Sequence, residues 1–386
     1  MTIDSIADVA IPVEQEALLD YSTEYFINRA AFQAFKAATL LTDPFCKVRE
    51  YHYLAKVETD QIRALAFRIG MVAWACLALV TSLPGLLLRS LGTYLQKSPF
   101  IYLREAGEDK RLPLDRRFTL LSWNICCVAG GYTISDGGVV PWPDRIDAII
   151  EKILEADADV VSLYETLDTS SALVLYERLK KAGYNHFFFN MGSAGMTVSS
   201  GIFIASKYKI GDAEFTRFPS HMLVGRTKNC AKGIFSFALE SEGERVADIH
   251  AMHLQHSEIP EQPTDEERDA RKKEIQVAIG RIRAVSPELF VGDLNLDDNE
   301  YVALELDRQF EKGDLFGPKK SWGGDQFCAQ LEEKPVSGAL NLDHAMALRG
   351  SVRSIQTTLV ETNYDPTIFS QNALSDHEGL LVTCEV

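Results

Sequence analysis

The sequence predicts a layered α/β domain that follows a helical, apolar N-terminal extension. Short apolar runs that are typical of buried strands recur from Phe118 to the C-terminus, with helix-like stretches between some of them. Strands that alternate with helices favour sheets that are covered on both faces. Hydrophobic residues make up 46% of the chain and charged residues 24%, which is the composition of a folded protein with a large core.

The N-terminal extension contains one segment that stands out by its hydropathy. Apolar residues recur at helical spacing over residues 13–68, and Pro44 is expected to break this helical pattern. Residues 69–88 then contain no charged side chain and are about as long as a bilayer core is thick. Three interpretations stay open for this segment: a spanning helix, a re-entrant or interfacial helix kinked at Pro84, or a helix buried in the fold.

The charge distribution favours a division into a helical region over residues 1–117 and an α/β domain over residues 118–386. The first part is close to neutral, whereas the second carries the whole formal net charge of -16. Acidic surface disfavours tight, non-specific binding to nucleic acid and attracts divalent cations.

The cysteines and the N-terminus indicate a compartment. The seven cysteines include no C-x-x-C pair, which argues against a thiolate zinc site and against a disulfide framework. The first residues are acidic and amphipathic, unlike a secretory signal peptide. We therefore expect a membrane-associated protein whose α/β domain lies in a reducing, cytosolic compartment.

The expected elements of the α/β domain follow one another along the chain. Strands are expected over residues 118–125, 158–165, 200–207, 232–239, 246–254, 287–295 and 378–386. Helices are expected over Asp144–Glu155 and over Asp265–Val285, the second with Thr264 as its N-cap. The charged run over residues 265–274 is interpreted as a solvent-exposed helix face.

Polar side chains that can bind a metal end several of these strands. They are Asn124, Glu165, His253, Asp293, Asn295, Asp343, Asp376 and His377. Buried polar groups are unfavourable unless they are paired or bind a metal, and functional residues concentrate at strand ends. Asn124, Glu165 and Asp376 offer the oxygen ligands that Mg²⁺ prefers, and Asp343 is a candidate to fix the tautomer of His377. The chemistry that this predicts is metal-assisted hydrolysis of a phosphate ester.

The ordered motifs SWN, YE, SSG, HLQ, GDLN, LDH and SDH resemble the endonuclease/exonuclease/phosphatase family from Phe118 to the C-terminus. The resemblance implies a four-layered α/β sandwich, in which two packed mixed sheets are flanked by helices. It also implies a metal-dependent phosphoric ester hydrolase that uses Mg²⁺, with Mn²⁺ as a possible substitute. The metal ligands implied are Asn124, Glu165 and Asp376, and the catalytic residues implied are His253, Asp293, Asn295, Asp343 and His377.

The same resemblance implies a role for each catalytic residue. His253 matches the histidine that stabilises the phosphoryl oxygens, and the pair Asp293 and Asn295 matches the residues that orient water and phosphate. His377, oriented by Asp343, is expected to act as the general base, with Asp293 as the alternative.

Further motifs are similar to the neutral sphingomyelinase-like branch. These are AKGIF (Ala231–Phe235) followed by HLQ, and the run SSGIFIASKYKI. By this similarity Lys232 and Trp322 are expected to bind substrate. Met252 and Tyr164 depart from the branch, which usually has threonine and glutamine there.

We therefore expect a phosphodiesterase that releases the headgroup of sphingomyelin or a related phospholipid at a membrane surface. The alternatives are a nuclease, a membrane-anchored scaffold without activity, and an inositol phosphate or phosphoinositide phosphatase. The phosphatase would need a cluster of basic residues, for which the candidates are Lys207, Lys209, Arg226, Lys228 and Lys232.

Three weaker signals complete the expectations. Residues 187–191 either dip into lipid headgroups or form a buried strand. His250 and His253 face opposite sides of a strand, which argues against a zinc site in the H-x-x-H-x-x-H run. Arg271 or Gln276 is expected to pack from its helix toward the GDLN strand.

Overall fold

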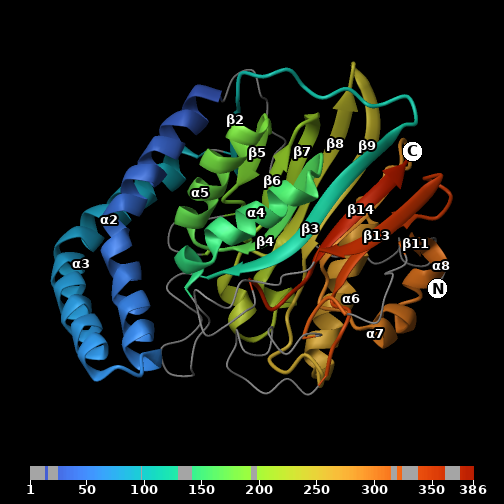
Figure 1. The fold of residues 1–386 in the computed structure, drawn as a ribbon. Coiled ribbons are helices and arrows are strands. Elements are labelled where there is room, and N and C mark those ends of the chain that lie inside the picture. Colours follow the sequence, from blue (N-terminus) through green and yellow to red (C-terminus); the bar gives the residue numbers. More distant parts are fainter. Residues whose placement is uncertain are drawn as a thin grey trace.

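The computed structural model shows a sandwich of two sheets with helices on both outer faces (Figure 1). It describes residues 14–15, 25–96, 98–128, 141–192, 198–313, 320–323, 338–360 and 374–386. Each sheet has seven strands within these residues. The four-layered α/β sandwich with an apolar N-terminal helix is confirmed.

One sheet has the strand order β13-β14-β3-β4-β6-β5-β2. The bounds are β2 Ile101–Arg104, β3 Arg117–Cys127, β4 Val160–Thr166, β5 His186–Phe189, β6 Phe203–Ser206, β13 Ser354–Val360 and β14 Gly379–Glu385. Strand β3 pairs in parallel with β4 and antiparallel with β14. Strand β2 pairs antiparallel with β5, so this sheet includes residues on the N-terminal side of Phe118.

The other sheet has the strand order β1-β7-β8-β9-β10-β12-β11. The bounds are β1 Glu14–Gln15, β7 Lys209–Arg217, β8 Gly233–Ser241, β9 Glu244–His253, β10 Glu288–Asp293, β11 Phe310–Lys312 and β12 Asp343–Leu348. Strand β10 pairs in parallel with β9 and antiparallel with β12. These three strands place the HLQ, GDLN and LDH motifs at the same end of the sheet, where β9 and β10 finish and β12 begins.

Three apolar clusters hold the layers together. The first lies between the sheets and includes Leu120, Phe235 and Val291. The second packs the outer face of the β3 sheet against helices, and the third does the same for the β10 sheet. The helices are α2 Tyr25–Val57, α3 Gln61–Leu95, α4 Ile146–Ala156, α5 Thr169–Leu179, α6 Asp265–Ile279, α7 Asp298–Ala303 and α8 Leu306–Gln309. Short 3₁₀ turns are η1 Trp142–Asp144, η2 Lys180–Ala182, η3 Ser220–Met222 and η4 Gly225–Asn229.

The expected elements match these with shifts at their ends. All seven strands expected from the apolar runs are present. Thr264 caps α6 with a capping box, but α6 ends at Ile279 because Gly280 follows as its C-cap. Residues 187–189 lie in β5, where every side chain is buried, so an insertion of this segment into headgroups is wrong.

Helices α2 and α3 form an antiparallel pair on one side of the sandwich, with α3 outermost (Figure 1). Pro44 lies inside α2 and Pro84 inside α3, so the expectation that Pro44 breaks the helix is wrong. A proline inside a helix costs about 3 kcal/mol, and the packing of α2 against both neighbours outweighs that cost.

The two helices differ in burial. Helix α2 places Ala31, Phe32 and Phe35 in the cluster under α5. Helix α3 is long and apolar enough, by length and composition, to cross a membrane, yet only 11% of its most apolar window is buried. The interpretation of residues 69–88 as a helix buried in the fold is therefore wrong.

Replacing Phe32 with alanine is expected to lower the free energy of unfolding by about 3 kcal/mol, because its buried ring packs edge-on against Tyr176 and Phe189. Phe45→Ala is the matched control on the same helix, since Phe45 is 55% exposed, and it is expected to cost less than about 1 kcal/mol. Urea unfolding of the full chain in detergent measures both. Equal losses would contradict the packing of α2 on the sandwich.

Candidate active site

The strand ends of both sheets meet at one edge of the sandwich. Asn124 and Glu165 come from the parallel pair β3 and β4, and His253 and Asp293 from the parallel pair β9 and β10. Asp293 is also the register partner of Asp343, the first residue of β12. The sheet pairing alone therefore gathers residues that are far apart in the sequence.

Two glycines of the motifs are needed by this arrangement. Gly292 precedes Asp293, and a Cβ there would come within 1.9 Å of the Met252 carbonyl oxygen on β9. Gly201 of the SSG motif has a φ of +76° and lies against the backbone of Glu165, where a Cβ would be 3.1 Å from its Cα. Both positions require glycine because the backbones approach closely.

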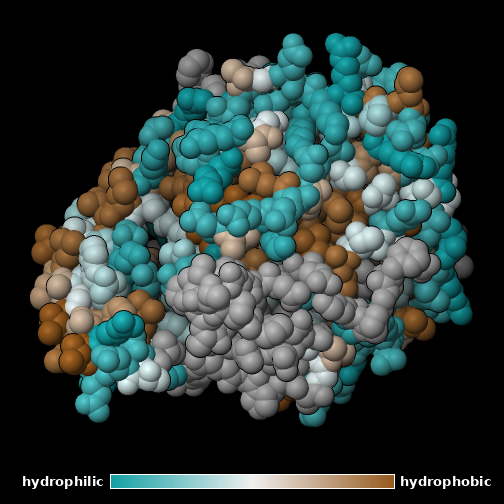
Figure 2. Space-filling view, in the orientation of Figure 1, coloured by the Kyte–Doolittle hydropathy of each residue, from teal (hydrophilic) through white to brown (hydrophobic). Residues whose placement is uncertain are grey.

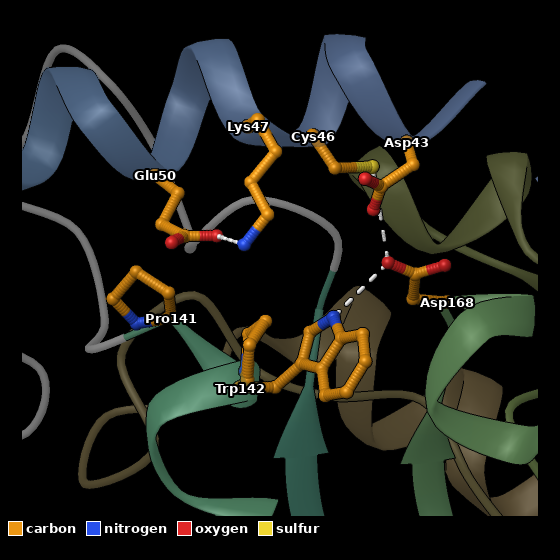
Figure 3. Close-up of a pocket in the computed structure, with 8 residues that line it drawn as sticks. Asp43, Cys46, Lys47, Glu50, Pro141, Trp142 and Asp168 are labelled. Atoms are coloured by element: carbon orange, nitrogen blue, oxygen red, sulfur yellow. Dashed lines mark hydrogen bonds and ion pairs between the residues drawn. The ribbon is translucent and has the colours of Figure 1, made fainter. Parts of the chain in front are cut away.

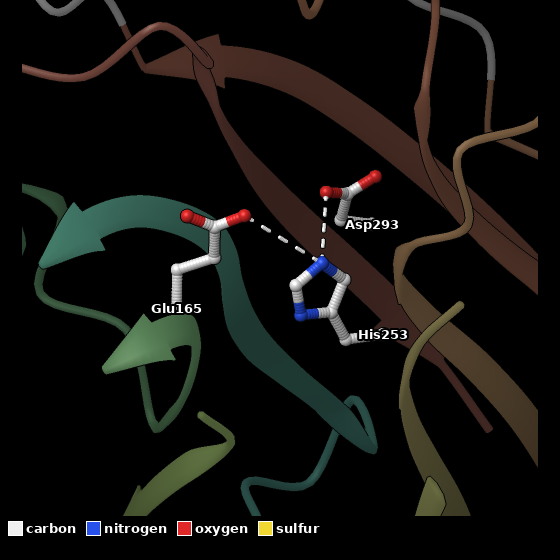
Figure 4. Close-up of side chains that lie close together, drawn as sticks. All are labelled: Glu165, His253 and Asp293. Carbon is white, nitrogen blue, oxygen red and sulfur yellow. Dashed lines mark ion pairs between the residues drawn. The ribbon is translucent and has the colours of Figure 1, made fainter. Parts of the chain in front are cut away.

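Asp293 lies at the centre of the site. Its Oδ2 accepts a hydrogen bond from Asn124 Nδ2 at 3.0 Å and is 3.4 Å from His253 Nε2 and 3.8 Å from His377 Nε2. Its Oδ1 accepts from the backbone N–H of Asn295 at 3.0 Å. Glu165, His253 and Asp293 point toward one another (Figure 4), and Glu165 Oε1 is 3.8 Å from His253 Nε2.

His377 is held by a carboxylate and by its backbone. Its Nδ1 lies 2.8 Å from Asp343 Oδ2, and its carbonyl accepts from Trp123 Nε1 at 2.9 Å. The hydroxyl of Ser321 accepts from the backbone N–H of Asp343 at 3.0 Å. Trp322, the next residue, forms an isolated antiparallel bridge with His377. The arrangement fixes the direction in which Nε2 of His377 points.

The pKa values of the two histidines shift in opposite directions because their surroundings differ. Burial alone would lower the pKa of His377, but Asp343, Asp376 and Asp293 raise it well above its ordinary value. Burial, with the nearby charge of Lys232, lowers the pKa of His253 well below its ordinary value. The surroundings therefore favour the protonated form of His377 and the neutral form of His253.

Two buried groups indicate that the site is built for a polar ligand. Neither ring nitrogen of His253 has a hydrogen-bond partner within the described part of the chain, although the ring is 3% exposed. Burial raises the pKa of Asp293 to about 6, an effect that the charge of His377 opposes. A buried imidazole without a hydrogen-bond partner is rare in proteins, and an incoming polar ligand would satisfy it.

The expected magnesium ligands form a donor set that fits a hard divalent cation. Burial and the neighbouring carboxylate of Asp376 raise the pKa of Glu165, so the two acidic groups are close enough to repel. Asn124 Oδ1 accepts one hydrogen bond, from the backbone N–H of Cys126, which leaves a lone pair. Two carboxylates and an amide oxygen are ligands that Mg²⁺ prefers.

The two residues expected to bind substrate are both buried beside this centre. Lys232 Nζ donates to the carbonyl of Leu254 at 2.9 Å, and burial lowers its pKa. Trp322 is 6% exposed and pairs with the backbone of His377. The five catalytic candidates, the three metal-ligand candidates and the two substrate-binding candidates from the sequence therefore lie in one site.

Comparisons with known proteins agree with this architecture. No family model and no curated protein matches the chain. Among solved structures, SmcL matches with a TM-score of 0.56 and 20% identity, over 70% of this chain and 99% of that one. A Staphylococcus aureus beta toxin variant with bound magnesium ions matches with 0.56 and 18%, over 69% and 98%. TDP2 from D. rerio with a single-strand DNA product matches with 0.50 and 17%, over 70% and 99%.

The chain has the endonuclease/exonuclease/phosphatase fold. This confirms the fold that the resemblance of the motifs implied.

Residues that the motifs did not reveal hold the candidate site in place. Arg145, 3% exposed, donates to the carbonyls of Ile125, Cys126 and Leu374, and so ties the segment after Asn124 to the one before Asp376. In the sequence Arg145 stands in a helix-like stretch with no motif. Its role depends on three carbonyls that are distant along the chain, so no local pattern marks it.

Helix α6 supports the turn that follows His253. Arg271 is fully buried, pairs with Glu300 on α7 at 2.7 Å and donates to the Gln255 carbonyl at 3.2 Å. Glu274 Oε2 accepts from the Gln255 backbone N–H at 2.9 Å. Arg271 turns inward, and its hydrogen bonds go to Glu300, Gln255 and Ser257. The interpretation of residues 265–274 as a solvent-exposed face is wrong for the side that includes Arg271 and Glu274.

Glu274→Gln is expected to remove a pH dependence of stability. Burial raises the pKa of Glu274 to about 8, against 4.5 ordinarily. The folded state therefore binds this proton more tightly, and the stability it contributes is lost as pH rises from about 4.5 to about 8. The glutamine keeps an acceptor for Gln255 and does not titrate. We expect the parent and the variant to have equal free energies of unfolding at about pH 5. At about pH 8 the variant is expected to be more stable by about 1–3 kcal/mol.

Denaturant unfolding at several pH values checks this, with Glu266→Gln on the exposed face of α6 as the control. A difference between parent and Glu274→Gln that does not change with pH would contradict the burial of this carboxyl group.

Proposed function

We propose that the chain is a Mg²⁺-dependent phosphodiesterase that hydrolyses the headgroup ester of a phospholipid at a membrane surface. One observation supports it above the others: Asp293 lies between His253 and the His377–Asp343 pair, beside the carboxylate of Glu165. A carboxylate flanked by two imidazoles is suited to activating water next to a phosphate. The fold, which other phosphodiesterases share, supports the same class of reaction.

The magnesium ion is held, in this proposal, by Glu165, Asp376 and Asn124. When bound, it polarises a phosphoryl oxygen and neutralises charge that develops in the transition state. The similar beta toxin structure holds magnesium ions, which supports this choice of metal.

Proton transfer follows from the electrostatics of the protein side chains. Water attacks phosphorus in line with the leaving group, and its oxygen forms the new P–O bond. The P–O bond to the lipid breaks, and the departing alkoxide takes up a proton from solvent to leave as the lipid alcohol. Asp293 accepts the proton of the water, since its raised pKa makes it a stronger base than an exposed aspartate. The neighbouring carboxylates raise the pKa of His377, which suits this ring to donating hydrogen bonds, so we propose Asp293 as the general base, the alternative that the sequence left open.

His253 and His377 act on the phosphoryl oxygens from two sides of Asp293. The neutral His253 donates from the one nitrogen that carries a proton, and His377 donates from Nε2 while Asp343 holds Nδ1. Asn295 has a left-handed φ of 52°, its backbone N–H donates to Asp293 Oδ1, and in this proposal its side chain orients the phosphate. Stronger hydrogen bonds to the charged transition state than to the substrate lower the barrier.

A lipid substrate is supported by three independent features. The AKGIF and HLQ runs, similar to the sphingomyelinase-like branch, place Lys232 beside the site. Helix α3 presents an apolar surface on the same chain. The formal charge of -16 disfavours a long polyanion.

Three of the five basic residues considered for a phosphoinositide phosphatase are paired or buried. Lys207 pairs with Asp157 at 2.6 Å, Lys209 pairs with Glu240 at 2.6 Å, and Lys232 is buried. These three lysines therefore do not form a basic rim for extra phosphates. A nuclease stays the second candidate, because one similar structure holds a single-strand DNA product.

Purified protein with Mg²⁺ is expected to release phosphocholine from sphingomyelin in mixed micelles, and Glu165→Ala is expected to lower the rate by about 10²-fold or more, because one of the two carboxylate ligands is lost. Glu266→Ala removes an exposed carboxylate from α6 and serves as the matched control. The same panel includes phosphatidylcholine, phosphoinositides and single-stranded DNA. Cleavage of DNA without lipid turnover would overturn the lipid substrate and keep the phosphodiesterase.

Asp343→Asn is expected to lower kcat by about 10²–10⁴-fold with little change in KM, because the amide no longer stabilises the protonated ring of His377. Asp307→Asn, an exposed aspartate on α8, is the control. Steady-state kinetics on the substrate that the panel identifies separates the two constants. An unchanged kcat would show that the His377–Asp343 pair takes no part in the reaction.

A further inference from the structure

Helix α3 turns its small residues toward α2. Two glycines of α3 lie close to α2. A Cβ on Gly85 would be 2.8 Å from Thr42 Cγ2, and a Cβ on Gly92 would be 3.2 Å from the ring of Phe35. Ala78 and these two glycines are the residues of α3 that are buried. Small side chains at these spacings let the two helices approach along most of their length.

The opposite face of α3 is apolar and exposed from one end to the other. Its large exposed side chains include Ile62, Leu65, Ile69, Val72, Leu79, Leu83, Leu87 and Tyr94. Most of them are three or four residues apart, so they form one stripe along the helix. Figure 2 shows these hydrophobic side chains gathered at the edge of the molecule, over α3. Leu79 is 84% exposed, so no other part of the described chain covers the middle of the stripe.

Helix α2 is fixed to the sandwich by its other side at two places. Near its start, Phe32 packs against Tyr176 and Phe189. Further along, α2 meets η1 and the start of α5 around a cavity of about 200 Å³ (Figure 3). There Asp168 accepts hydrogen bonds from Trp142 Nε1 at 3.0 Å and from Cys46 Sγ at 3.9 Å.

Because α2 packs along α3, α3 cannot be surrounded by lipid on all sides. If α3 spanned the membrane, α2 would have to lie in the membrane beside it. Helix α2 carries Lys47 and Glu50, which face the sandwich around the cavity. A bilayer that surrounded α3 would therefore have to contain charged groups and part of the α/β domain.

We infer that α3 lies in the plane of the membrane, with its exposed stripe sunk into one leaflet and α2 between it and the α/β domain. Helix α3 has 35 residues, roughly 50 Å, against a hydrocarbon core of about 30 Å. This length suits a helix that lies flat better than one that spans. The inference deepens the proposed function, on which it rests for the presence of a lipid surface near the active site.

The charges of α3 favour a lipid surface over a second copy of the chain. Residues 61–104 contain no acidic residue, while Arg63, Arg68 and Arg89 stand at both ends of the apolar stretch. Arginines at these ends suit anionic headgroups. Two copies paired through α3 would bring arginines together with no acidic residue of α3 to compensate them.

The first test measures binding of the full chain to vesicles of phosphatidylcholine and phosphatidylserine by sedimentation. The double variant Leu79→Lys with Leu83→Lys is expected to bind about 100-fold more weakly, since two side chains leave the acyl boundary. The control, Val285→Lys with Val302→Lys, adds the same charge at exposed sites away from α3. Equal binding by both double variants would overturn the inference.

The second test measures how deep α3 lies. Tryptophan is introduced singly at Ile62, Leu79 and Leu91, and quenching by brominated phosphatidylcholine is compared with the parent. Similar quenching depths at the three positions support a helix in the plane. A deep middle position between two shallow ends would show a spanning helix, and absence of quenching together with a concentration-dependent dimer would show a second copy. Either result overturns the inference.

A soluble diester separates this inference from the proposed function. Turnover of bis-p-nitrophenyl phosphate with Mg²⁺ is expected to be unchanged in the Leu79→Lys, Leu83→Lys variant, because α3 takes no part in the site. Loss of vesicle binding with unchanged turnover supports both proposals. Vesicle binding without turnover of any phosphodiester would contradict the proposed function alone.

Discussion

The burial of one carboxylate, Asp293, is the constraint on which the site depends. It is 2% exposed and lies where the two sheets bring strand ends together. Asn124 from the opposite sheet donates to it, and His253 and His377 lie on either side. A buried carboxylate needs such partners, because desolvation disfavours its charge. The hydrogen bond that Asn124 donates to Asp293 connects the two sheets. It also holds a proton acceptor between two imidazoles, an arrangement suited to the proposed hydrolysis of a phosphodiester.

The α2–α3 pair adds a layer that the fold does not need but that the proposed substrate does. Helix α2 packs its apolar side chains into the cluster that it shares with α5 on the outer face of the β3 sheet, as an ordinary core helix does. Helix α3, by contrast, exposes apolar side chains that water solvates poorly. Near this junction Asp168, three residues after Glu165 in the sequence, receives hydrogen bonds from α2 and η1. These hydrogen bonds connect the α2–α3 pair to the segment that follows the candidate metal ligand Glu165.

The sequence predicted seven of the fourteen strands in the described residues, and it singled out ten candidate residues that the structure brings together, because these signals are local. Each strand is a buried apolar run, and its polar end residue stands out against it. The continuation of α2 through Pro44 was not predicted, since it depends on packing with α3 and the sandwich. Arg271 and Glu274 lie in a run that is polar throughout, so composition gave no sign of the face that turns inward. Arg145 was missed because its three acceptors come from two distant segments.

The central claim is that Asp293 activates water for the hydrolysis of a phosphodiester when Mg²⁺ is bound. Phosphocholine release from sphingomyelin in mixed micelles, compared between the parent and Asp293→Asn, tests it most directly. The asparagine keeps the shape of the side chain and can still accept from Asn124, but it is a far weaker proton acceptor. We expect the parent to turn over only with Mg²⁺ and the variant to be slower by about 10³-fold, with folding unchanged by circular dichroism. A variant that hydrolyses the lipid as fast as the parent would contradict the account.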